Sequence, residues 1–321
     1  MLKQTLLILG SALCLHAWQT RAADLKDFPS QTHWVLNVDL MAARASPMVN
    51  FIVDKMDAVR RQEAQKKLDA IKAMFGVDLV KDIDQLVIAG NGDAEKGGVA
   101  YVYGAFDTQR LTTILAGGKD FASIDYSGFK VLSWLDEKDS KPKYLSFAKP
   151  GLAMLSSSSS ALTDALDVLT GNKAGLAPDA PISDAFAPTS QAVLSLHAFD
   201  ISAIVGQAPK AKMLQQAQAL SLLVQTVDAD TLEAALSVTT ATAETALQIQ
   251  QAIMGIQALM LLQTGSKPEI ATLASLAQIT SNGSTVNITL KLPKAMIEKA
   301  MNDCQARQAA ATAAPVPAAT N

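Results

Sequence analysis

The sequence is poor in aromatic residues and carries no concentration of positive charge. Aromatics make up 5% of its 321 residues, and the formal net charge is −3. Proteins that bind nucleic acid usually combine clustered Lys and Arg with aromatic side chains on which bases stack. Loss of Lys3 and Arg21 with a cleaved N-terminal segment would take the net charge from −3 to −5. We therefore expect no nucleic-acid partner.

Histidine and cysteine are also scarce, so we expect no metal site and no cofactor. Beyond the N-terminal segment the histidines are His33 and His197, and no H-x-x-x-H or C-x-x-C spacing occurs. If Cys14 is removed with that segment, Cys304 is the last cysteine and no intrachain disulfide can form. Cys304 is then either an ordinary helix residue or a thiol that links two copies as a homodimer.

The first 22 residues have the pattern of a secretory signal peptide. Lys3 is followed by the apolar run Leu6–Leu15 and by a small residue, Ala22, at a suitable cleavage position. The run is short for a membrane span, although a retained anchor is the alternative. The bulky Leu13 before Cys14 argues against a lipoprotein signal. We expect an exported protein, periplasmic or extracellular, cleaved near Ala22.

One sequence pattern occurs twice and suggests an internal duplication. Pro29–Leu40 reads PSQTHWVLNVDL, and Pro188–Asp200 reads PTSQAVLSLHAFD. Each copy places proline and turn-forming residues before a short apolar run, as at the start of a core strand. Hairpin signals at Ser127-Gly128 and Asn282-Gly283 favour antiparallel pairing.

These patterns predict an α+β protein with two similar halves, each a mostly antiparallel sheet with helices packed on one face. We place the first half at 24–171 and the second at 191–303. The stretch 172–190 is rich in Pro, Ala and Asp and is expected to be a linker. The Ala/Pro-rich tail, 304–321, is expected to be disordered.

Helix boundaries are predicted by capping residues. Ser46 with Pro47 should start a helix that runs to Phe75, and Thr242 should start a long apolar one. Asp107 should cap a helix over Thr108–Leu115. Two further helices are expected, Ala161–Leu169 after Ser160 as N-cap and Pro293–Met301 at the end of the fold.

Two motifs suggest chemistry but lack the context that the chemistry needs. The glycines between Gly90 and Gly98 could cradle a phosphate, but a dinucleotide fingerprint opens a helix, and a strand is predicted next. Ser127 and Lys130 match S-x-x-K, but S-D-N and K-T-G are absent and the pair falls at a hairpin turn. We identify no catalytic residue.

The helix predicted over Ala246–Leu262 is the strongest candidate for a binding surface. No charged residue lies between Glu244 and Lys267, and glutamines argue against a transmembrane span. A helix that is apolar on all sides is normally buried. The alternative is an exposed face for an apolar ligand, a protein partner, a second copy of the chain or a membrane surface. The candidate contact residues are Leu247, Ile249, Ile253, Met254, Ile256 and Met260.

Three segments carry a family resemblance. FPSQTHWVLNVDL (28–40), GVDLVKDIDQLVIAG (76–90) and VYGAFDTQRLTTIL (102–115) resemble an uncharacterised type of exported bacterial protein built from two related α/β halves. The resemblance implies a location in the cell envelope and carries no catalytic residue over to this chain.

We therefore expect a non-catalytic envelope protein that binds a protein partner or an apolar ligand, through a groove between the halves. Two alternatives stay open. One is a hydrolase-like periplasmic enzyme whose catalytic carboxylates cannot be recognised from the sequence. The other is a structural component of the envelope.

Overall fold

The computed structural model describes residues 23–56, 58–92, 97–178, 192–201, 216–263 and 268–313. The predicted signal peptide, residues 1–22, lies outside these ranges. So do residues 179–190 of the predicted linker, residues 314–321 of the predicted tail and the side chain of Cys304.

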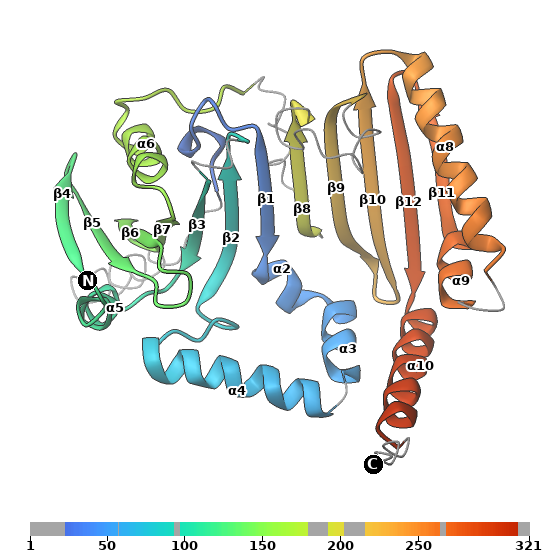
Figure 1. Cartoon of the computed structure of the whole chain (residues 1–321), viewed down its shortest axis with the longest axis horizontal. Helices are drawn as coiled ribbons and strands as arrows, with labels where there is room; N and C mark the ends of the chain where they lie inside the picture. The colour runs from blue at the N-terminus through green and yellow to red at the C-terminus, as the bar shows by residue number, and fades with distance from the viewer. Residues whose placement is uncertain are drawn as a thin grey trace, which may run out of the picture.

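The described part of the chain forms one antiparallel sheet of twelve strands, in the order β11-β12-β10-β9-β8-β1-β2-β3-β7-β6-β5-β4 (Figure 1). The strands are β1 (Trp34–Asp39), β2 (Ile83–Gly90), β3 (Gly98–Gly104), β4 (Ala122–Tyr126), β5 (Phe129–Leu135), β6 (Pro142–Lys149), β7 (Leu152–Ser156), β8 (Ala192–Phe199), β9 (Ala217–Asp228), β10 (Thr231–Thr240), β11 (Ala277–Asn282) and β12 (Thr285–Pro293). The α+β class and the antiparallel pairing are confirmed.

The two predicted halves meet as neighbouring strands of this sheet. β1 and β8, which carry the repeated pattern, pair antiparallel with Leu36 opposite Leu196 and Val38 opposite Leu194. The expected groove between the halves is therefore wrong, because a ladder of backbone hydrogen bonds occupies that position. From this central pair the order runs outward through β2 and β3 on one side and β9 and β10 on the other. A duplication remains a prediction.

Eight α-helices and one short 3-10 helix accompany the described strands. They are η1 (Leu25–Asp27), α2 (Leu40–Ala45), α3 (Pro47–Lys55), α4 (Ala58–Phe75), α5 (Thr108–Ala116), α6 (Ser159–Thr170), α8 (Ala243–Leu261), α9 (Pro268–Leu276) and α10 (Lys294–Ala313).

Capping residues explain most helix starts. Ser46, Asp107 and Thr242 are N-caps as predicted, each accepting a hydrogen bond from a backbone N–H of the first turn. The N-cap of α6 is Ser158 instead of Ser160, since the Ser158 hydroxyl accepts the Ala161 N–H. Gly171 ends α6 in the left-handed conformation, with φ 79°.

Three helix predictions are corrected. The helix expected from Ser46 to Phe75 is divided into α3 and α4 near Met56, whose backbone is extended. No helix was predicted at α2, which follows β1 directly with Asp39 as its N-cap. The last helix continues to Ala313, so the first ten residues of the predicted disordered tail, 304–313, are helical.

Helices pack on both faces of the sheet in the first half, where one covered face was expected. On one face, Leu162, Ala165 and Leu166 of α6 pack with Tyr101 and Met154 of the sheet. On the other, Leu115 of α5 packs with Leu132 and Leu145. Because successive strand residues point to opposite faces, β3 contributes Tyr101 to the first core and Val102 to the second.

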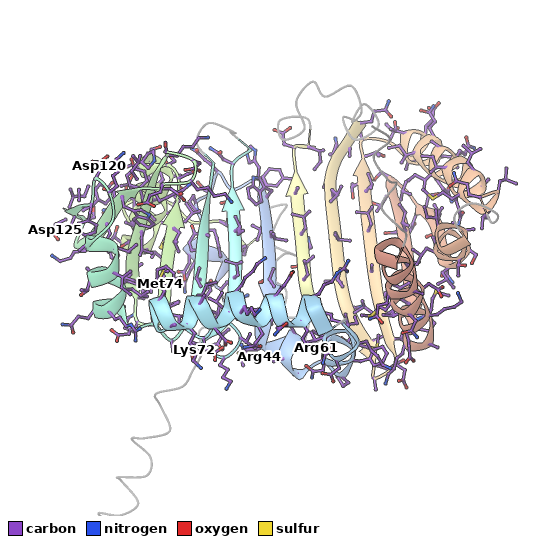
Figure 2. The ribbon with its side chains drawn as sticks, turned by 60° about the horizontal axis from the view of Figure 1, so that its bottom comes forward. Arg44, Arg61, Lys72, Met74, Asp120 and Asp125 are labelled. Carbon is purple, nitrogen blue, oxygen red and sulfur yellow. The ribbon has the colours of Figure 1, made fainter. Side chains whose placement is uncertain are left out.

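The long helix α4 passes below the ends of the central strands, and Figure 2 shows it crossing in front of them. Its central residues are mostly exposed. Two arginines fix its ends. Arg61 donates to the backbone oxygens of Asp54 and Met56, and Arg110 of α5 donates to the Ala73 oxygen.

Candidate functional site

A single row of apolar side chains crosses eleven strands on one face of the sheet. Each member lies directly opposite the next in the strand register. From β5 to β11 the row is Leu132, Leu145, Leu155, Ala100, Ile88, Leu36, Leu196, Leu222, Leu236, Ile288 and Ile279. We call the side of the sheet that carries this row the apolar face.

Helices bury the two ends of the apolar face. At the β5 end, Leu115 of α5 packs in the cluster that reaches Leu155 and Val102. At the other end, Ala246, Ile249 and Ile253 of α8 pack in a cluster that reaches Leu220 and Leu236. Both helices therefore lie on the same face, toward opposite margins of the sheet.

Between these clusters lies a group of residues that we call the central apolar face. Its side chains are half-buried, neither enclosed nor fully exposed, and they belong to none of the three buried clusters. From β2 to β9 it spans three strand spacings, about 14 Å across the sheet. The central apolar face consists of Leu36, Val38, Leu86, Ile88, Leu194, Leu196, Leu222 and Val224.

The opposite face of the second half is polar. Ser237 donates to Asn287 Oδ1 at 2.8 Å, and Gln225 donates to Glu233 at 2.9 Å. Lys291 lies 3.5 Å from the same glutamate. This face is therefore suited to contact with water, whereas the central apolar face carries no polar side chain. The two sides of β9 differ residue by residue, since Leu222 points to the apolar face and Ser221 to the polar one.

The structure separates the six residues that the sequence proposed for the apolar helix, now α8. Ile249 is 4% exposed and packs on the sheet with Ile253, which is the buried interpretation. Leu247, Met254, Ile256 and Met260 are exposed, which is the surface interpretation. The helix is therefore buried on one side and exposed on the other, and binding at the exposed side stays a prediction.

Two glutamines of α8 explain why this apolar helix carries amides. Gln250 donates to the Ile279 oxygen at 3.3 Å, and Gln257 donates to the Ala277 oxygen at 2.8 Å. These carbonyls belong to β11, the last strand of the sheet, so the glutamines occupy hydrogen-bonding positions along its edge. Ser281 completes the contact by donating to Gln250 Oε1.

The orientation of α8 follows from these contacts. Ile249 and Ile253 face the sheet while Gln250 and Gln257 face its β11 edge. Residues one position apart differ by about 100° around a helix axis. Ile256 therefore lies on the flank of α8 opposite the β11 edge, where it is exposed.

The C-terminal end of α8 is apolar around its whole circumference. Leu259 is 63% exposed and Leu262, directly after the helix, is 80% exposed. Met260 and Leu261 between them are also exposed. We call Leu259–Leu262 the α8 tip. Within the described ranges, no helix is long and apolar enough to cross a membrane.

A small pocket lies beside the glycine-rich loop, where β2 ends and β3 begins. Its volume is about 60 Å³, enough for a few water molecules. Thr32, Asn91, Gly98 and Asp164 line it together with Tyr101. Residues 93–96 of that loop lie outside the described ranges, and β3 follows the loop, as the hairpin interpretation expects.

The residues weighed for catalysis are placed in structural roles. Ser127, with φ 49°, and Gly128 form the turn between β4 and β5. His33 packs against Phe199 with ring centroids 4.7 Å apart and ring planes tilted by 52°. Across the described part of the chain, no three His, Cys, Asp or Glu side chains gather as a metal site would require. The Tyr101 hydroxyl is fully buried in the core, and this burial raises its pKa well above the ordinary value.

Comparison with known proteins adds one distant likeness. No protein-family model matches the chain, and no curated protein matches it significantly. The crystal structure of TP0453 (crystal form I) is similar over 89% of this chain and 99% of that one, with a TM-score of 0.47 and 12% sequence identity. A likeness this distant carries no information about function.

Proposed function

We propose that the protein is a non-catalytic binding protein of the cell envelope that holds an elongated apolar ligand, such as a single acyl chain, on the central apolar face. One observation carries the proposal. The apolar row is uninterrupted across eleven strands, and its two ends pack in the clusters of α5 and α8, whereas its partly buried middle packs in none of the three buried clusters. The N-terminal pattern of a signal peptide supports the envelope location.

The chemistry of the face favours an apolar ligand. Its backbone groups are used in the strand ladders, so it offers no free donor or acceptor for a polar molecule. Its eight aliphatic side chains would gain about 25 cal/mol for every Å² removed from water. Helices on two sides make the face better suited to a slender ligand than to a broad protein surface.

Binding of a fluorescent long-chain fatty acid to the protein lacking residues 1–22 tests this proposal. Leu222→Gln places an amide on the central apolar face and is expected to weaken binding at least tenfold, or about 1.4 kcal/mol. Leu223→Gln is the matched control, because the next residue on the same strand points to the opposite face. We expect that control to bind within twofold of the unchanged protein.

Equal affinities for the two variants would contradict the proposal, as would an unchanged protein that does not bind the probe. Circular dichroism first establishes that both variants are folded. If Leu222→Gln is not folded, Leu222→Phe replaces it, because a larger apolar side chain occupies the site without adding a polar group. Native mass spectrometry of protein isolated from cells then identifies the bound molecule. A co-purifying protein in place of a small molecule would favour the protein-partner alternative.

A further inference from the structure

We propose that the α8 tip inserts into the surface of a neutral phospholipid bilayer and docks the protein there. The tip lies apart from the central apolar face, so the docking proposal and the ligand-binding proposal can fail separately.

The distribution of the exposed side chains points to a fluid partner. Four consecutive residues at 100° steps cover the full circumference of a helix, and all four residues of the tip are exposed. A protein partner or a second copy of the chain covers one side of a helix, as the sheet covers Ile249 and Ile253. Lipid chains can surround the end of a helix on every side.

The depth of insertion is limited by the residues on either side of the tip. The tip is about one helical turn, and Gln263 follows it directly. Toward the N-terminus, Gln257 holds α8 to the backbone oxygens of Ala274 and Ala277. Only the last turn is therefore available, which is a shallow contact with the region just below the headgroups.

The absence of charged and aromatic residues from α8 predicts which lipids the α8 tip prefers. Helices that bind anionic membranes carry Lys and Arg on their polar face and often an aromatic anchor. α8 has no Lys, Arg, Phe, Tyr or Trp, and no charge falls between Glu244 and Lys267. The exported chain would have a net charge of about −5, which an anionic surface repels. Docking should therefore depend on apolar insertion and weaken as anionic lipid is added.

Flotation with phosphatidylcholine vesicles tests the docking. The protein lacking residues 1–22 should float with the vesicles, and Leu259→Glu/Leu262→Glu should reduce the bound fraction at least tenfold, because two charges replace the inserting leucines. Both positions are exposed, so the variant should remain folded. Ile124→Glu is the matched control, since Ile124 is 55% exposed on β4 at the opposite end of the sheet (Figure 1). It should float like the unchanged protein.

Three outcomes would overturn the proposal. The double variant could float as well as the unchanged protein, or binding could rise when phosphatidylglycerol replaces part of the phosphatidylcholine. A protein that does not float, but sediments as a dimer that the double variant dissociates, would assign the tip to a second copy. Fatty-acid binding in solution separates this test from the earlier one, because the double variant should retain it and Leu222→Gln should still float.

Discussion

At the scale of single residues, the clearest unexpected feature is a carboxylate inside α6. Asp167 is 8% exposed, and the Tyr126 hydroxyl donates to its Oδ2 at 3.0 Å. Lys173 lies 3.5 Å from the same carboxylate oxygen. These contacts connect the end of α6 to the β4–β5 hairpin, and such long-range partners could not be inferred from sequence spacing. A buried carboxylate needs such partners to remain charged.

This contact predicts a stability difference that depends on pH. The hydrogen bond to Asp167 raises the pKa of Tyr126 above its ordinary value of about 10. A raised folded-state pKa means that the bond contributes fully below pH 10 and is lost as the pH rises through the raised value. Tyr126→Phe should therefore lower the urea midpoint at pH 7, and its difference from the unchanged protein should shrink above pH 10.

Urea unfolding at pH 7 and at successive alkaline values checks this prediction, with tyrosine absorbance as the record of ionisation. A difference between the two proteins that stays constant through the alkaline range would contradict it. Tyr101 is the internal control, because burial is the main cause that raises its pKa well above the ordinary value, whereas a hydrogen bond to a carboxylate is the main cause for Tyr126.

Residue by residue, the sequence could identify the apolar helix but not which side of it is exposed. A period of 3.6 residues separates two faces only when one of them is polar, and α8 is apolar on both. Its glutamines provided the usable signal. Gln250 and Gln257 are seven residues apart, hence on one stripe, and that stripe lies on the edge of β11.

At the scale of elements, α8 protects the last strand of the sheet. An uncovered edge strand presents free N–H and C=O groups that pair readily with other chains. Gln250→Ala/Gln257→Ala should destabilise the protein by roughly 4 kcal/mol, about 1 kcal/mol for each of the four side-chain hydrogen bonds that the two amides make. It should also aggregate faster, because the β11 carbonyls become available to other chains.

Urea unfolding and light scattering at 37 °C check this prediction. Gln248→Ala/Gln251→Ala is the matched control, since both residues are exposed on the same helix. Equal stability and equal aggregation of the two double variants would show that the edge contacts have no effect.

Elements with local signals were predicted well, and those fixed by distant contacts were not. Thr242 and Asp107 cap their helices as expected, and both hairpin turns occur where glycine permits a positive φ. The break between α3 and α4 was missed because it is stabilised from outside the helix pattern. Arg61 of α4 donates to backbone oxygens at the end of α3, and no spacing rule describes that contact.

At the scale of the whole molecule, the β1–β8 ladder makes the two halves parts of one sheet, so they should unfold together. The tryptophans of the described residues, Trp34 and Trp134, lie in the first half, whereas circular dichroism reports both halves. Leu236→Ala removes apolar contacts from the second half and should cost about 2 kcal/mol. Fluorescence and dichroism curves should shift equally in urea.

A fluorescence midpoint that stays in place while the dichroism curve shifts would show two independent units and contradict this prediction. Leu115→Ala, in the α5 core of the first half, provides the reciprocal measurement.

The sequence predicted the fold class and most strands, but not the candidate site. Alternation shows that Leu222 and Val224 share a face of one strand, yet only strand order and register place them beside Leu196 and Leu194. The central apolar face is formed by pairing between strands that are distant in sequence. For the same reason, the predicted groove between the halves was replaced by a strand pair.

The two margins of the sheet are unequal, and this limits how copies of the protein can join. The β11 margin is occupied by the glutamines of α8, whereas β4 ends the sheet at the other side with its strand residues mostly exposed (Figure 2, near Asp125). Each copy thus has one exposed edge strand, β4, with which another chain can pair. Two copies joined through β4 would have an α8 at both outer margins, so growth by strand addition would stop at a pair and could not form a filament.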